Sequence, residues 1–118
     1  MYFTPTEVLN NMDKTFGVLG PGTVAANKIT LTLPAVANKR HYIGSIVLTD
    51  TAGTGGNEKL IIKKGTTTIW EESFAVGQDK VRQFQVVPLV GGFGESVIIE
   101  VSATNLTAGK LYVIYYTK

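Results

Sequence analysis

Short runs of β-branched and aromatic residues, separated by glycine-rich turns, fill the chain from Gly22 to its end. The turns recur at intervals close to the roughly 8–12 residues that are typical of β-sandwiches and β-barrels. In the clearest run, residues 28–33, alternation places Ile29, Leu31 and Leu33 on one face and threonines on the other. Further strands are predicted over residues 41–50, 58–64, 66–74, 81–87, 96–102 and 111–117, with another extended piece near residues 16–19.

These seven or eight strands predict an all-β fold. A single open sheet would leave one apolar face in water, so we expect two antiparallel sheets packed face to face, of either the jelly-roll or the immunoglobulin-like type. A chain of 118 residues has the size of one domain. We therefore expect an N-terminal arm over residues 1–21 and a β-sandwich domain over residues 22–118.

A short helix is predicted within the N-terminal arm. Thr4 is suited to cap it, Pro5 to occupy its first position, and Glu7 to complete a capping box, with the helix ending near Asp13. About ten residues form too short a helix to be stable alone, so the segment must dock on its own sandwich or on a neighbouring subunit. Its apolar stripe consists of Val8, Leu9 and Met12.

A hairpin is predicted around Gly65. If Gly65 and Thr66 are the turn residues of a type II′ turn, glycine occupies the position that requires a positive φ. The strands then pair Lys64 with Thr67, Ile62 with Ile69, Ile61 with Trp70, and Lys59 with Glu72. Apolar residues oppose apolar residues in this register and a lysine opposes a glutamate, which a turn at Lys64-Gly65 would not achieve.

The predicted register puts Leu60, Ile62 and Ile69 on the core side of the hairpin. It leaves Ile61 and Trp70 on the outer face among charged residues. Aromatic side chains are enriched at the centres of protein interfaces, so this pair is a candidate contact patch. The alternative is that the N-terminal segment of the same chain covers Trp70.

The charge distribution argues against nucleic-acid binding. The net charge is +2 and the basic residues never form a run, whereas nucleic-acid-binding faces cluster them. Only 17% of the residues are charged, against roughly 25% in typical soluble domains, which indicates a surface partly covered by a partner. The N-terminus lacks the features of a signal peptide and no run is long enough to span a membrane, so we expect a protein made in a cytoplasm.

No group of residues predicts catalysis, a cofactor or a metal site. Glu71 and Glu72 are adjacent on a strand and therefore point to opposite faces, so they cannot act together as a glycosidase pair. His41 is the only histidine and the chain has no cysteine, which excludes a zinc cluster. His41 follows two basic residues at a strand entrance, where we expect a surface position.

The segment "PLVGGFGES", residues 88–96, resembles a phosphate-binding loop only superficially. It lacks the glycine spacing and the lysine of such loops, and it precedes a strand where they precede a helix. It is therefore predicted to be a turn. Its Phe93 is expected either to fold back as a plug over the end of the sandwich or to be offered to a neighbouring subunit.

The aromatic residues leave carbohydrate binding open. Trp70, Tyr112, Tyr115 and Tyr116 are candidates for a sugar-stacking surface. The last strand, "LYVIYYT", is however apolar on both faces, which more simply indicates a central strand or one covered by a neighbour.

The runs "HYIGSIVLTD", "LIIKKGTTTIW", "VVPLVGGFGESVIIEVSA" and "LYVIYYT", in this order and spacing, resemble the small β-sandwich structural proteins of tailed bacteriophages, particularly those that decorate the capsid. The resemblance covers roughly residues 22–118. It implies a protein that is found in the virion and binds the assembled shell, with the major capsid protein or another virion protein as its partner. It also implies a homo-oligomer.

Our prediction is therefore a non-enzymatic structural protein of a phage particle, with a carbohydrate-binding or host-adhesion module as the alternative. We expect no cofactor, no nucleic acid and no membrane among its partners. The candidate protein-interface residues are Val8, Leu9, Met12, Ile61, Trp70, Phe93, Tyr112 and Tyr116.

Overall fold

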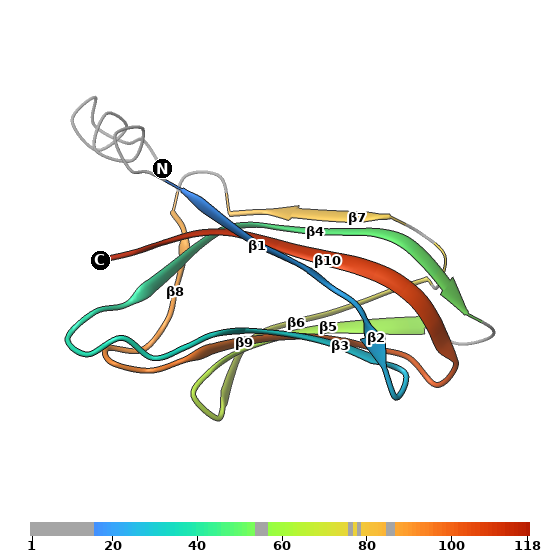
Figure 1. The fold of residues 1–118 in the computed structure, drawn as a ribbon, viewed down its shortest axis with the longest axis horizontal. Coiled ribbons are helices and arrows are strands. Elements are labelled where there is room, and N and C mark those ends of the chain that lie inside the picture. Colours follow the sequence, from blue (N-terminus) through green and yellow to red (C-terminus); the bar gives the residue numbers. More distant parts are fainter. Residues whose placement is uncertain (1–15, 54–56, 76, 78, 85–86) are drawn as a thin grey trace.

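The computed structural model describes residues 16–53, 57–75, 77, 79–84 and 87–118. In this part of the chain there are ten β-strands and no helix, arranged as two antiparallel sheets of five strands that lie one over the other (Figure 1). The predicted all-β architecture with two antiparallel sheets is confirmed. The helix predicted over residues 4–13 lies outside the described residues.

Sheet A contains the two longest strands. Its order is β1, β10, β4 and β7, and β8 also pairs with β4. The strands are β1 (Gly17–Gly22), β10 (Leu106–Thr117), β4 (His41–Gly53), β7 (Lys80–Gln83) and β8 (Leu89–Val90). β1 accounts for the extended piece predicted near residues 16–19, and β4 and β10 curve together over the other sheet (Figure 1).

Sheet B has the order β2, β3, β9, β5 and β6. Its strands are β2 (Val24–Ala25), β3 (Lys28–Leu33), β9 (Val97–Ser102), β5 (Asn57–Lys64) and β6 (Thr67–Ala75). Each strand predicted between residues 28 and 117 has a counterpart in one of the two sheets, although β7 ends at Gln83 where the sequence pattern continues.

The strand pairings are nested around the turn at Gly65 and Thr66. β5 pairs with β6 across this turn, β4 pairs with β7 and β8, β3 with β9, and β1 with β10. Successive pairs alternate between sheet B and sheet A. The described strands therefore follow the path of one long hairpin, centred on this turn, that is folded over into two layers.

The core lies between the sheets and is built by every second residue of the strands. The predicted inward placement of Ile29, Leu31 and Leu33 is confirmed. Burying such a side chain contributes roughly 1.5–3 kcal/mol relative to leaving it exposed. The buried apolar residues are Ile29, Leu31, Leu33, Ile43, Ile46, Leu48, Leu60, Ile62, Val97, Ile99, Val101, Leu106, Leu111 and Val113.

The predicted hairpin register is correct only next to the turn. Lys64 pairs with Thr67, and Gly65 has the required positive φ, at 56°. A β-bulge then follows, so that Ile62 faces Trp70, Ile61 faces Glu71 and Leu60 faces Glu72. The predicted pairs of Ile62 with Ile69, Ile61 with Trp70 and Lys59 with Glu72 are therefore wrong.

The bulge has a consequence for every side chain beyond it. An extra residue in one strand shifts the register by one, and a shift of one residue exchanges the two faces of that strand. Trp70 is opposite the fully buried Ile62 and packs against the core, so its predicted position on the outer face is wrong. Lys59 forms its ion pair with Glu71, at 2.7 Å.

A glutamate is buried at the start of β5. Glu58 has no exposed surface, and neither of its carboxylate oxygens has a hydrogen-bond partner. A buried carboxylate without a partner loses its hydration and gains nothing in return. Burial accordingly raises the pKa of Glu58 above its ordinary value of 4.5.

We predict that Glu58→Gln stabilises the protein at neutral pH by about 1–3 kcal/mol, because it removes the charge without changing the shape of the side chain. The folded protein retains the Glu58 proton at pH values where the unfolded chain has released it. The contribution of Glu58 to the free energy of unfolding therefore falls as the pH rises above 4.5. Urea unfolding at several pH values, followed by the fluorescence of the single tryptophan, measures this difference.

The matched control for this prediction is Glu71→Gln, on the exposed side of β6. This substitution removes the carboxylate that pairs with Lys59, and it should change the free energy of unfolding by less than about 1 kcal/mol, since exposed ion pairs contribute little. Equal stability of Glu58→Gln and the unmodified protein at pH 7 would show that the buried carboxylate is not destabilising.

Candidate functional site

The outer faces of the two sheets differ in chemistry. On sheet B, Glu100 lies 3.5 Å from Lys63 and 3.9 Å from Lys28, and Lys59 pairs with Glu71. These ion pairs connect neighbouring strands in contact with water. The outer face of sheet B is therefore a hydrated, charge-paired surface.

The outer face of sheet A carries three rows of uncharged residues that cross its strands. In one row Val18 lies beside Ile114, and Ile114 beside Ser45. In the second, Tyr112 lies beside Val47, and Val47 beside Val81. In the third, Tyr116 lies beside Tyr42, and Tyr42 beside Val90. We define the apolar face as Phe16, Val18, Tyr42, Val47, Val81, Val90, Tyr112, Ile114 and Tyr116.

Aromatic rings form one end of the apolar face. Tyr42 and Tyr116 stack with their ring centres 4.7 Å apart and their planes 8° apart, and the ring of Phe16 meets Tyr116 edge-on at 5.2 Å. Gly44 makes room for this arrangement, because a Cβ there would lie 2.9 Å from the Phe16 ring. Burial, with a smaller contribution from Tyr42, raises the pKa of the Tyr116 phenol, so this phenol is neutral at physiological pH.

The edges of the apolar face are the most exposed part of it. Val18 on β1 is 65% exposed and Val81 on β7 is 55% exposed. Among the described residues, the three rows contain no charged side chain: Lys118 follows Tyr116 by two residues, and Lys110, two residues before Tyr112, pairs with Asp50 at 3.7 Å. An apolar centre with charges at its rim is the arrangement found at protein interfaces.

Four of the predicted interface residues lie in three different places. Tyr112 and Tyr116 belong to the apolar face. Ile61 lies half-buried on the outer face of sheet B, between the ion pairs, and Trp70 packs between the sheets. Val8, Leu9 and Met12 lie outside the described residues.

The remaining members of the apolar face were not predicted from the sequence: Phe16, Val18, Tyr42, Val47, Val81, Val90 and Ile114. The signal that points to them is the continuous apolar character of residues 41–48 and 111–116. A strand that is apolar on both sides in a two-layer fold must have one of these sides against a partner or in water.

Trp70 belongs to a polar and aromatic cluster that we call the seam, formed by Trp70, Glu72, Lys80, Arg82 and Phe84 where β6 and β7 close one side of the sandwich. The Arg82 guanidinium donates two hydrogen bonds to Glu72, at 3.0 and 2.6 Å, and Lys80 lies 3.5 Å from the same carboxylate. Arg82 also lies over the Trp70 ring, 5.3 Å from its centre, and Phe84 meets that ring edge-on. The seam therefore joins sheet B to sheet A.

The Arg82 guanidinium lowers the pKa of Glu72 by its hydrogen bonds, and burial only partly opposes this effect. The carboxylate is thus held ionised between the sheets. The carboxylate forms ion pairs with both Arg82 and Lys80, and it accepts a long hydrogen bond of 3.5 Å from the Trp70 indole N–H.

Phe93 does not plug the sandwich. Its side chain is 57% exposed, and the Arg40 guanidinium lies 5.6 Å from its ring centre. The loop is held instead by its backbone: Gly91 donates to the His41 carbonyl and Gly94 to the Lys39 carbonyl, each at 2.8 Å. Since these N–H groups already have partners, they are not free to bind a phosphate.

His41 is buried, not on the surface as predicted. Only 3% of it is exposed, because it faces inward as the first residue of β4. Its Nε2 donates to the Pro34 carbonyl, which can only accept, and its Nδ1 forms a hydrogen bond with the Thr117 hydroxyl, both at 2.7 Å. Both ring nitrogens have structural partners, so His41 has no nitrogen available as a base or a ligand.

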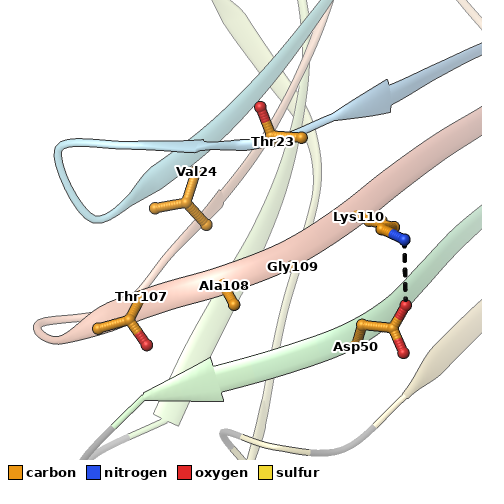
Figure 2. A pocket seen from close by; sticks show the side chains of 7 residues that line it. All are labelled: Thr23, Val24, Asp50, Thr107, Ala108, Gly109 and Lys110. Carbon is orange, nitrogen blue, oxygen red and sulfur yellow. Dashed lines mark ion pairs between the residues drawn. The ribbon is translucent and has the colours of Figure 1, made fainter.

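A hollow of about 300 Å³ opens at the end of the sandwich between β2, β4 and β10 (Figure 2). Its lining residues are Thr23, Val24, Asp50, Thr107, Ala108, Gly109 and Lys110, and its charged pair is the exposed Lys110 and Asp50. Figure 2 shows this ion pair between β10 and β4, with Thr23, Val24, Thr107 and Ala108 along the other side. The two charged groups that line the hollow thus form an ion pair with each other.

Within the described ranges, no three side chains of histidine, cysteine, aspartate or glutamate are grouped to hold a metal ion. No helix in the described part of the chain is long and apolar enough to cross a membrane. No known protein family matches this chain, and no characterised protein has a detectably similar sequence. The apolar face is therefore the strongest candidate functional site.

The seam leads to a prediction about stability. Glu72→Gln should lower the free energy of unfolding by about 1.5–3 kcal/mol, because it removes the charge that Arg82 and Lys80 share between the sheets. Since the folded pKa of Glu72 is lowered, its stabilisation is complete above 4.5 and is lost as the pH falls through the folded pKa. Urea unfolding at pH 7 and below pH 4.5 tests both parts.

Glu71→Gln again serves as the control, because it removes the neighbouring carboxylate on the opposite face of the same strand. If both variants lost the same small amount of stability, the ion pair of the seam would have no special role in joining the sheets.

Proposed function

We propose that this protein is a non-enzymatic structural protein of a bacteriophage virion, where it associates with other subunits through the apolar face and decorates the assembled capsid. The observation that carries the proposal is the contrast between the two outer faces. Sheet B presents ion pairs to water, whereas sheet A presents valine, isoleucine, tyrosine and phenylalanine side chains. Contiguous exposed apolar patches of this kind mark interaction sites.

The strand order supports a jelly roll as the type of sandwich. In an immunoglobulin-like sandwich the first strand pairs with the second, whereas here β1 pairs with the last strand, β10. The nested pairs alternate between the sheets, as in a long hairpin that is rolled up. Jelly rolls recur in viral capsid proteins, which agrees with a virion role, although lectins use the same architecture.

A weak contact is sufficient for a protein that decorates a lattice. Binding to the assembled shell and not to its separate subunits stabilises the shell by mass action. Repeated sites also raise the local concentration of each subunit, so a modest affinity at the apolar face gives high occupancy. Such a role requires a rigid scaffold, which the core and the seam supply.

Carbohydrate binding is less well supported. The four aromatic residues suggested by the sequence do not share a surface: Trp70 lies in the seam, and Tyr115 packs against the core. Tyr112 and Tyr116 share a face, but Tyr42 stacks on the Tyr116 ring and Phe16 meets it edge-on. Sugar recognition by stacking needs an open ring face.

We predict that the purified protein binds phage capsids that lack their decoration protein, and that it does so at stoichiometric occupancy. Val81→Glu should lower the apparent affinity by about tenfold or more, since a charge in the apolar face must lose its hydration on association. Co-sedimentation with the capsids and imaging of the particles measure the occupancy.

Thr32→Glu is the matched control, because it adds the same charge to the exposed outer face of sheet B and should leave binding unchanged. The proposal fails if the unmodified protein does not bind to any such capsid. Binding on a glycan array that is lost on changing Tyr112 would favour the adhesion alternative.

A further inference from the structure

The apolar face raises the question of which surface covers it. We infer that a second copy of this chain does so, with the outer face of one sheet A packed on the outer face of the other. This inference rests on the proposed function, since it names the partner at the surface through which the protein associates. It is carried by the charge, the size and the shape of the face.

The absence of charge along the rows makes the face compatible with its own copy. The described residues of the three rows include no lysine, arginine, aspartate or glutamate. Two identical faces can therefore meet without placing like charges together, which is the requirement for an isologous contact. Lys118 and the pair of Lys110 with Asp50 would lie at the rim and stay hydrated.

The size of the face agrees with a weak dimer. Neighbouring strands lie about 4.8 Å apart and successive residues about 3.3 Å apart, so the face measures roughly 20 Å by 20 Å with its side chains. Two such faces would bury on the order of 1,000 Å² in total, at the lower limit for a specific interface. We therefore expect a dissociation constant in the micromolar range and not a permanent dimer.

The apolar face is the outer surface of a β-sheet, and its shape suits packing against a second sheet. Val18 and Val81 project at its two edges, and the Tyr42–Tyr116 stack gives a firm aromatic end. Sheets pack face to face about 10 Å apart when side chains of this kind interdigitate. The same packing already joins sheet A to sheet B inside each molecule.

Two other occupants are possible in principle. The stripe predicted from the sequence of the N-terminal arm, Val8, Leu9 and Met12, has three apolar side chains, against nine in the apolar face. A shell protein could also meet the face directly. Sedimentation equilibrium of the full chain distinguishes these occupants from a second copy.

The test is sedimentation equilibrium of the full chain between about 1 and 300 µM, which brackets the expected micromolar dissociation constant. We expect a monomer–dimer equilibrium in this range. Val18→Glu and Val81→Glu should each raise the dissociation constant at least about tenfold, because the two-fold contact places two charges in the interface. Thr32→Glu should not change it, and thermal unfolding must show that all three variants are folded.

A full chain that stays monomeric at the highest concentration overturns the inference. So does a dimer that Val18→Glu and Val81→Glu leave intact. If the monomer is explained by residues 1–15, their deletion will make the protein dimerise, and the face then belongs to the arm in the full chain.

Capsid binding, measured in parallel, distinguishes the two proposals. A monomeric protein that binds capsids through the apolar face retains the proposed function and loses the second copy. A dimer that binds no capsid retains the second copy and loses the proposed function.

Discussion

The pairing of β4 with β10 is the contact on which the rest of the structure depends. It joins residues 41–53 to residues 106–117 along the middle of sheet A, and both the core and the outer surface are built on it. On the inner side it sets Ile46 beside Val113; on the outer side it sets Tyr42 beside Tyr116 and Val47 beside Tyr112. Because the side chains of a strand alternate, the register of this pairing, with its three shifts, determines which residues face the core and which face outward.

The outer faces of the two sheets differ in how many charged side chains they present to water. Sheet B spreads its charges between neighbouring strands, where exposed ion pairs contribute little stability but keep the surface hydrated and discourage association. Among the described residues, no such pair lies in the three rows of sheet A. The carboxylate of Glu72, on β6 of sheet B, lies in the seam and accepts two hydrogen bonds from Arg82 of β7. Charge thus joins the two sheets at the seam and covers the outer face of sheet B, whereas the described rows on the outer face of sheet A are uncharged.

Much of the fold could be predicted from local patterns. Alternation alone located Ile29, Leu31 and Leu33 on the core side, and the glycine at position 65 located the central turn. The bulge beside Ile62 could not be predicted from local alternation. It accompanies the packing of Trp70 against Arg82 and Phe84, which lie 12 and 14 residues further along the chain. That one extra residue reversed the predicted faces of Trp70 and placed it in the seam. His41 was misplaced for a similar reason, since its partner Thr117 is 76 residues away.

The sequence by itself determined the class of the fold and the residues that must avoid water, because alternation is a property of neighbouring residues. It also indicated Tyr112 and Tyr116, since a strand in a two-layer fold needs only one apolar face for its core, and residues 111–117 are apolar on both. Only the tertiary structure decided that Phe16, Val18, Val81 and Val90 join them, because these residues come from three segments that the nested pairing brings to one sheet. A surface of this kind has no local signature: it exists only once the register of every strand is set.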